Sequence, residues 1–338
     1  MSVQIIRPGL LATIQDLGRY GFQQYGVVVG GAMDSLSLRL ANVLVGNEEG
    51  EAAIEVTMMG TSLQFNEDTL ISITGGNLNP VIGGNPVPLW RPVFVQKNTV
   101  LSFTGCKAGC RAYVAVAGGF SIPNVMNSKS TYIRGEIGGF KGRALQEGDL
   151  IPPGEENSFS RKIKKVLQSK LKQRSFASTD WYVPFERYVN RSVVRVLKGA
   201  EYAKFSESSQ KQFFEKEFQI TPQSDRMGYR LSGASLGLKQ PFELLSEAVA
   251  NGTIQVPSDG NPIVLLADRQ TTGGYPRIGQ IAAADLPIIA QMKPGDRVRF
   301  QEISLYEAEQ LYMEREQEIK QIRTALLLKK WSFDGAKP

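Results

Sequence analysis

The residues best suited to chemistry lie together in residues 268–276, which read Asp-Arg-Gln-Thr-Thr-Gly-Gly-Tyr-Pro. They follow the apolar stretch 263–267, which predicts a strand. The two glycines let backbone N–H groups approach a ligand closely, and the arginine and two threonine hydroxyls add hydrogen-bond donors. Such a loop can hold a carboxylate or a phosphate. The alternative is a tight β-turn in which Asp268 accepts hydrogen bonds from loop amides. The loop is not a P-loop, because no Gly-Lys-Ser/Thr follows.

A second polar cluster occupies residues 224–231 and contains two arginines, Arg226 and Arg230, four residues apart. Two guanidinium groups can grip a carboxylate or phosphate through paired N–H bonds. The alternative is a surface ion pair with Asp225, which contributes little to stability. A third cluster, residues 247–255, ends in Gln255 and is typical of either a barrel mouth or a simple turn.

The N-terminal half has polar segments of its own. Residues 30–34 precede a predicted helix, so their backbone amides could face an anion. Residues 127–134 are rich in hydroxyl groups, and residues 138–143 form a glycine-rich turn with two cations. Each such segment is more often a turn than a binding site.

Composition excludes several classes of enzyme. The chain has no histidine, so it contains no Ser-His-Asp triad, no Cys-His pair and no HExxH zinc helix. Its two cysteines, Cys106 and Cys110, are too few for a Cys₄ zinc site and too far apart for a CxxC redox pair, and we expect reduced thiols. No apolar run approaches the roughly 18 residues of a membrane span, and no signal-peptide core is present, so we expect a cytoplasmic protein.

The net charge of +6 comes from one segment. Residues 157–179 contain seven lysines and arginines and no acidic residue, and the rest of the chain is nearly neutral. A basic stretch can bind phosphate backbones. Apolar residues recur at helical spacing within it, however, and no aromatic residues alternate with the lysines. This pattern favours a solvated surface helix, and we expect neither a nucleic acid nor a membrane as partner.

The elements that must position these clusters are mostly short strands between Gly, Pro, Asn and Asp turns, which is typical of barrels or sandwiches. The predicted strands are residues 71–74, 93–96, 100–104, 112–117, 193–197, 263–267 and 297–301. Helices are expected from Asp34 to Gly46, from Asp285 to about Met292, and from Ser304, which forms a capping box with Glu307. For the last helix, packing on its own domain is favoured over binding a partner.

Two pairs of similar segments indicate an internal duplication. Residues 84–89 resemble 260–265, residues 146–151 resemble 293–298, and the order is the same in both halves. We therefore predict a mainly β protein of two related β-barrel domains, residues 1–156 and 181–302. A basic linker would occupy residues 157–180, and a C-terminal helix and tail residues 303–338.

Several of these motifs resemble one family, the allophanate hydrolase subunit 2-like proteins. This biotin-dependent carboxyltransferase-like family includes part of urea carboxylase and the C subunits of bacterial 5-oxoprolinases. The resemblance covers about residues 5–302, and the motifs that carry it are residues 30–34, 41–42, 46–47, 128–131, 142–143, 225–231, 252–257 and 268–276. One position departs from the family, whose members commonly read Gly-Ser-Arg-Ser-Thr where this chain has Asn-Ser-Lys-Ser-Thr at 127–131. Lysine keeps the charge there but loses the planar fork of arginine.

The resemblance implies two cyclophilin-like β-barrel domains and a component of an ATP-dependent 5-oxoprolinase. In that system, the A, B and C subunits convert 5-oxo-L-proline to L-glutamate with ATP hydrolysis, so ATP and Mg²⁺ would be required. This chain alone would be inactive. One alternative is a biotin-dependent carboxyltransferase acting on urea or a related amide, although this chain has no biotin attachment site. The other is a regulatory antagonist, in sporulation, of a histidine-kinase inhibitor that is homologous to the 5-oxoprolinase B subunit.

The implied chemistry requires stabilising negative charge on a phosphorylated amide oxygen. Without histidine, that role falls to arginines, hydroxyls and backbone N–H groups. We predict Arg226 and Arg230 as anion clamps, and Asp268 as an acid/base or a Mg²⁺ ligand, with no protein metal site otherwise. The predicted substrate- and phosphate-binding residues are Thr271, Thr272, Gly273, Gly274, Tyr275, Gln255, Asp225, Ser128, Ser130, Thr131 and Arg143.

Overall fold

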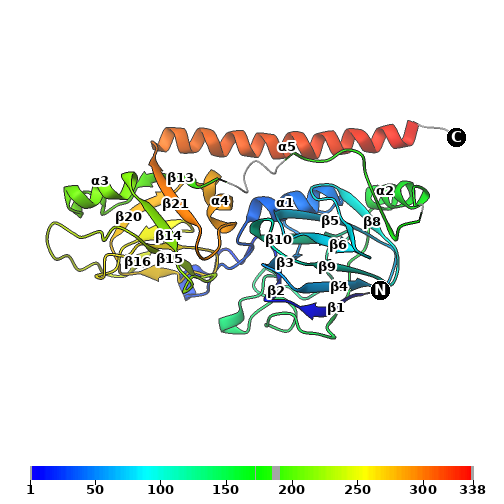
Figure 1. Ribbon diagram of the computed structural model, residues 1–338, viewed down its shortest axis with the longest axis horizontal. Helices are drawn as coiled ribbons and strands as arrows, with labels where there is room; N and C mark the ends of the chain where they lie inside the picture. Colours follow the sequence, from blue (N-terminus) through cyan, green and yellow to red (C-terminus); the bar gives the residue numbers. More distant parts are fainter. Residues whose placement is uncertain (1, 172, 185–190, 336–338) are drawn as a thin grey trace. The chain divides into compact units, whose positions relative to one another are not determined.

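The computed structural model describes residues 2–171, 173–184 and 191–335, and it confirms a mainly β fold (Figure 1). The chain divides into two compact units. Unit 1 comprises Met1–Gly18, Asp34–Val189 and Gln317–Pro338, and unit 2 comprises Arg19–Met33 and Asn190–Glu316. No helix in the described part of the chain is both long enough and apolar enough to cross a bilayer.

Unit 1 contains two six-stranded sheets. The first, in spatial order, consists of β11 (Leu150–Ile151), β1 (Val3–Pro8), β4 (Thr61–Phe65), β9 (Thr99–Phe103), β6 (Pro80–Ile82) and β7 (Asn85–Pro86). The second consists of β12 (Phe176–Ser178), β8 (Pro92–Val95), β5 (Thr69–Asn77), β10 (Ala108–Val116), β3 (Ala53–Thr57) and β2 (Leu11–Gln15). Alternate apolar residues of both sheets, such as Leu63 and Phe65 on one and Ile54 and Val56 on the other, form one core.

Helix α1 (Ser35–Leu44) covers the other face of the second sheet. Its N-cap is Asp34, whose carboxylate accepts hydrogen bonds from the backbone N–H and the hydroxyl of Ser37. The hydroxyls of Ser72 and Thr74 on β5 donate to carbonyls of α1, which ties the helix to the sheet. The predicted helix from Asp34 to Gly46 is therefore confirmed.

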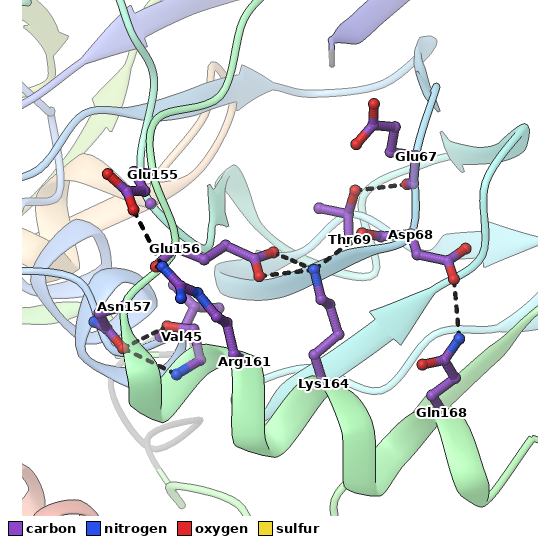
Figure 2. A network of polar contacts seen from close by, with 12 residues as sticks. Val45, Glu67, Asp68, Thr69, Glu155, Glu156, Asn157, Arg161, Lys164 and Gln168 are labelled. Carbon is purple, nitrogen blue, oxygen red and sulfur yellow. Dashed lines mark hydrogen bonds and ion pairs between the residues drawn. The ribbon is translucent and has the colours of Figure 1, made fainter.

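The basic segment forms helix α2 (Ser158–Ser169), and β12 follows it and pairs with β8. Phe159, Ile163 and Leu167 are buried on one side of α2, so the predicted surface helix is confirmed. Two of its cations, Arg161 and Lys164, form ion pairs with Glu155 and Glu156 (Figure 2). Residues 157–180, predicted as a linker, thus contain a helix and a strand of unit 1, because the apolar stripe of α2 packs on the sheet at β8 and β5.

Unit 2 is a closed barrel, as predicted. Its strands, in spatial order, are β13 (Val193–Lys198), β20 (Arg277–Ile281), β17 (Thr253–Gln255), β18 (Ile263–Leu265), β15 (Gly228–Ser232), β14 (Glu217–Ile220) and β21 (Arg297–Glu302). A separate ribbon pairs β16 (Glu247–Ala248) with β19 (Thr272–Gly273). Phe213, Phe218 and Phe300 pack ring against ring in the barrel core. The expected second barrel differs in unit 1, where the strands pair in two sheets.

The remaining helices are short, except for the last. They are α3 (Glu207–Glu215), α4 (Leu286–Ala290) and the 3₁₀ turns η1 (Gln23–Tyr25), η2 (Ile133–Gly135), η4 (Tyr202–Lys204) and η5 (Ala283–Asp285). Helix α5 (Leu305–Gly335) begins at the predicted capping box. Ser304 N–H donates to the Glu307 carboxylate at 2.7 Å, Glu307 N–H donates to Ser304 Oγ at 3.2 Å, and the bonds from Ser304 lower the pKa of Glu307.

Candidate functional site

Two of the predicted catalytic residues, Arg226 and Asp268, form a buried ion pair in unit 2. Arg226 Nε donates to Asp268 Oδ2 at 2.8 Å, and Nη2 donates to Oδ1 at 3.0 Å. Arg226 precedes β15 and Asp268 follows β18, and these strands are antiparallel neighbours, so the two ends meet. The side chains are 7% and 5% exposed, and Arg226 also donates to the carbonyl of Gly31. Each charge is therefore compensated within unit 2.

This pairing bears on the roles predicted for Asp268. Each of its carboxylate oxygens accepts a hydrogen bond from Arg226, and its predicted role as an acid/base or a Mg²⁺ ligand stays a prediction. The backbone N–H of Asp268 donates to the Arg226 carbonyl at 2.9 Å, which joins the same two loops again. The pair thus fixes the loop that carries residues 269–275.

Arg230 lies elsewhere on β15. Tyr229 and Leu231 point into the barrel core, and Arg230 between them is exposed. One of the two predicted clamp residues is therefore buried and paired, whereas the other faces solvent. Asp225 organises the turn before β15, because its Oδ1 accepts from the backbone N–H groups of Met227 and Gly228 at 2.8 and 3.3 Å.

The glycine-rich part of the loop lies against Gln255. Gln255 is buried, and its Nε2 donates to the Tyr275 carbonyl at 3.2 Å. A Cβ added to Gly273 would lie 2.5 Å from Gln255 Nε2, so a side chain at this position would displace the Gln255 amide. Thr271 is half-buried, Thr272 is exposed in the ribbon, and the Tyr275 side chain is 47% exposed. Gly273 and Tyr275 of the predicted cradle thus lie against a buried amide at the end of β17.

Arg269 adjoins Asp268; from the sequence it counts among the donors of this loop but is not among the predicted site residues. Its Nε and Nη1 donate to the carbonyls of Val249 and Leu266 at 3.4 and 3.3 Å, and the side chain is half-buried. It forms no ion pair with any other residue that the structure describes. Burial lowers the pKa of its guanidinium. Sequence adjacency to Asp268 was the available signal, but the pairing of Asp268 with Arg226 cannot be read from it.

Two of the predicted residues of the N-terminal half, Ser128 and Ser130, bind a carboxylate that sequence reasoning missed, that of Asp16. Its oxygens accept from Ser128 Oγ at 2.7 Å, from Lys129 N–H at 2.5 Å and from Ser130 Oγ. Thr131 Oγ1 donates to the Ile14 carbonyl, and Lys129 Nζ, at the family's arginine position, donates to Glu51 at 2.5 Å. These polar groups bind one another within unit 1.

Arg143 has a similar structural partner. Its Nη1 and Nη2 donate to the two oxygens of Asp149 at 2.7 and 2.8 Å. These bonds lower the pKa of Asp149 and raise that of Arg143. The pair closes the turn before β11, where the Asp149 carbonyl also accepts from Ile5 N–H on β1.

A buried polar chain in unit 1 involves residues that sequence reasoning did not place in the site. Tyr113 on β10 donates to Glu55 on β3 at 2.7 Å and accepts from Asp34 N–H at 2.8 Å. Burial and the two nearby carboxylates raise the pKa of Tyr113 well above its usual value. Cys106 and Cys110 are not bonded to each other.

A cavity of about 240 Å³ lies beside the network in Figure 2. Of the described residues that line it, Glu155, Glu156, Arg161 and Lys164 pair with one another, and Lys164 also donates to the Asp68 carbonyl at 3.4 Å. No predicted site residue is among the described residues of its lining. The described lining of this cavity and the predicted site therefore share no residue.

Comparison with known proteins identifies the family. Residues 25–302 match the family model described as "Carboxyltransferase domain, subdomain A and B". The chain is 40% identical to the C subunit of the Haemophilus influenzae 5-oxoprolinase, over 92% of this chain and 94% of that protein. It is 38% identical to the C subunit of the Escherichia coli 5-oxoprolinase, over 90% and 93%. The crystal structure of the K. lactis urea amidolyase matches with a TM-score of 0.83 and 27% identity, covering 95% of this chain and 20% of that one. The chain therefore belongs to the carboxyltransferase domain family, subdomain A and B, together with the C subunits of the 5-oxoprolinases.

Proposed function

We propose that this chain is the C subunit of an ATP-dependent 5-oxoprolinase that converts 5-oxo-L-proline to L-glutamate. The observation that carries the proposal is its similarity to two 5-oxoprolinase C subunits along nearly their whole length. The partners would be the A and B subunits, and the chain would be inactive without them. We place the activity in the cytoplasm, where ATP is abundant.

The reaction breaks the lactam C–N bond and consumes two waters in all, one for opening the lactam and one for converting ATP to ADP and phosphate. Phosphorylating the amide oxygen would activate the carbonyl carbon toward water; the ring nitrogen would then leave, and a second water would hydrolyse the resulting acyl phosphate to the carboxylate and phosphate. Negative charge on the oxygens at that carbon must be stabilised. With no histidine in the chain, we assign this task in unit 2 to the loop of residues 269–275. Thr271, Thr272 and the N–H groups of Gly273 and Gly274 would supply donors. ATP is the co-substrate, and Mg²⁺ would be held mainly by its phosphates.

In this proposal the Arg226–Asp268 pair is a positioning device. Its two hydrogen bonds fix the start of the loop relative to β15. A loop held in advance costs less to order when the substrate binds, which is the basis of catalytic preorganisation. Arg230 and Tyr275 are exposed, so they would contact the substrate or a partner protein only from the outside of the barrel.

A second candidate is a component of a carboxyltransferase that acts on urea or a related amide. The observation that favours it is the match of this fold to the K. lactis urea amidolyase. Carboxyl transfer would require a biotin carrier and a biotin carboxylase on other chains. The two candidates therefore differ in their co-substrates.

One experiment separates them. The purified chain is combined with the A and B subunits and given either 5-oxo-L-proline with ATP, or urea with ATP, bicarbonate, a biotin carboxylase and a biotinylated carrier. The proposal expects glutamate in the first mixture and no carboxylated urea in the second. The reverse result would replace the proposal with the carboxyltransferase.

A further inference from the structure

Arg269 differs from three other arginines of unit 2, Arg195, Arg226 and Arg277, in forming no ion pair with a described carboxylate. Arg195 pairs with Asp285 at 2.5 Å, Arg226 with Asp268, and Arg277 with Glu201 at 2.8 Å. Arg269 forms no ion pair within the described residues. A cation withdrawn from water without an opposite charge is unfavourable, so the barrel carries a cost that no described contact offsets.

The hydrogen bonds of Arg269 leave most of its binding capacity unused. A guanidinium carries five N–H donors. Only Nε and Nη1 donate to described residues, which are two backbone carbonyls, at distances of 3.4 and 3.3 Å that lie at the long end for such bonds. The group is thus held in place but is not satisfied.

The residues around Arg269 supply further donors. Val249 joins Arg269 to Thr271, because its carbonyl accepts from Arg269 Nε and its N–H donates to the Thr271 carbonyl at 3.2 Å. The hydroxyls of Thr271 and Thr272 make no hydrogen bond to another described residue. A guanidinium and two unused hydroxyls therefore gather in one loop.

We infer that Arg269 is the anion-binding residue of unit 2 and that it binds an oxyanion, either the carboxylate of the substrate or a phosphoryl group. An oxyanion supplies the missing opposite charge. It also accepts hydrogen bonds from the unused N–H groups of Arg269 and from a threonine hydroxyl. The neighbouring Arg226 cannot do the same, because both of its forked donors are engaged by Asp268. The choice of these ligands rests on the proposed function.

The test measures equilibrium binding to the full chain by calorimetry, with three probes. Inorganic phosphate represents the phosphoryl group, 5-oxo-L-proline carries the carboxylate, and pyrrolidin-2-one is the same lactam without it. Arg269→Gln should weaken binding of one anion at least tenfold, and Arg269→Lys should recover only part of the loss. Thr271→Val should weaken the binding of the same anion several-fold. Arg299→Gln, which removes an exposed arginine of β21, is the matched control and should change nothing.

The anion that loses affinity identifies the group bound at Arg269. A thermal unfolding measurement separates this role from a structural one, because removing an uncompensated, half-buried charge should leave the melting temperature unchanged or raise it. A lower melting temperature with unchanged anion binding would overturn the inference. The inference would also be overturned if the unaltered chain bound neither anion. It would equally be overturned if the Arg269→Gln variant bound both anions as tightly as the unaltered chain.

Failure of the proposed function has a different signature. If the reconstituted complex makes no glutamate while anion binding still depends on Arg269, the function is wrong and the site stands. If glutamate forms and Arg269→Gln alters neither anion binding nor the KM for 5-oxo-L-proline, the site is wrong and the function stands.

Discussion

Paired charges fix the loops that carry the candidate site. Arg226 and Asp268 are 42 positions apart in sequence, yet they form a bidentate pair because β15 and β18 lie side by side. The sequence indicated that both residues belong to specific motifs, but it contains no local signal for which carboxylate an arginine selects. For the same reason, Asp16 could not be identified as the partner of Ser128 and Ser130 before the strand pairing was known, and Arg269 could be named only as one donor of its loop.

Breaking this pair should destabilise unit 2. Asp268→Asn would leave the Arg226 charge buried without a partner, and we expect the free energy of unfolding to fall by about 3 kcal/mol, near the lower end for buried pairs. Urea unfolding of the full chain measures this change. Glu215→Gln is the control, because it removes an exposed pair with Lys211 at 3.9 Å and should cost less than about 0.5 kcal/mol. Equal effects of the two substitutions would contradict a stabilising role for the buried pair.

The Arg143–Asp149 pair makes a prediction about pH. The pKa of Asp149 is lowered in the folded chain from its ordinary value of 3.8, mainly by the hydrogen bonds from Arg143. The pair therefore stabilises the fold above that pH, and the contribution disappears as pH falls through the lowered pKa. Arg143→Gln should lower the melting temperature at pH 6, and the difference from the unaltered chain should shrink toward pH 3. A difference that stays constant across this range would show that Asp149 is not the partner that matters.

At the level of elements, local patterns were sufficient for helices and strands but not for sheet closure. Capping residues and apolar spacing correctly placed α1, α5 and the surface helix α2. The short strands were also found, but their order in space depends on contacts between distant residues. Similar segments in the two halves predicted two barrels. In the described part of the chain, the strands of unit 2 close into a barrel, whereas those of unit 1 pair in two sheets.

Helix α2 offers a test of which of its faces matters. Ile163 is 1% exposed and belongs to the apolar side, so Ile163→Ala should lower the free energy of unfolding by about 2 to 4 kcal/mol. Lys165, two residues later, is exposed, and Lys165→Ala should stay within about 0.5 kcal/mol. Chemical denaturation of both variants compares them directly. If Lys165→Ala were the more damaging change, the basic side would have to make contacts that the structure does not contain.

The whole chain is built from two units with interleaved sequence. Residues 19–33 belong to unit 2, although residues on both sides of them belong to unit 1, and α5 begins in unit 2 and ends in unit 1. No local composition marks these crossings, which is why boundaries predicted at 156 and 181 do not describe them. Family motifs occur in both units, so the activity we propose requires the complete chain, and we expect it to require partner proteins as well.

Omitting one component at a time tests most directly whether this chain is a required part of a 5-oxoprolinase. The A and B subunits are incubated with ATP and 5-oxo-L-proline, with and without this chain, and glutamate and ADP are measured together. We predict glutamate formation matched by ADP formation only when the three proteins are present, and none from this chain alone. Glutamate formed by this chain alone, or at the same rate when it is left out, would contradict its assignment as a required component.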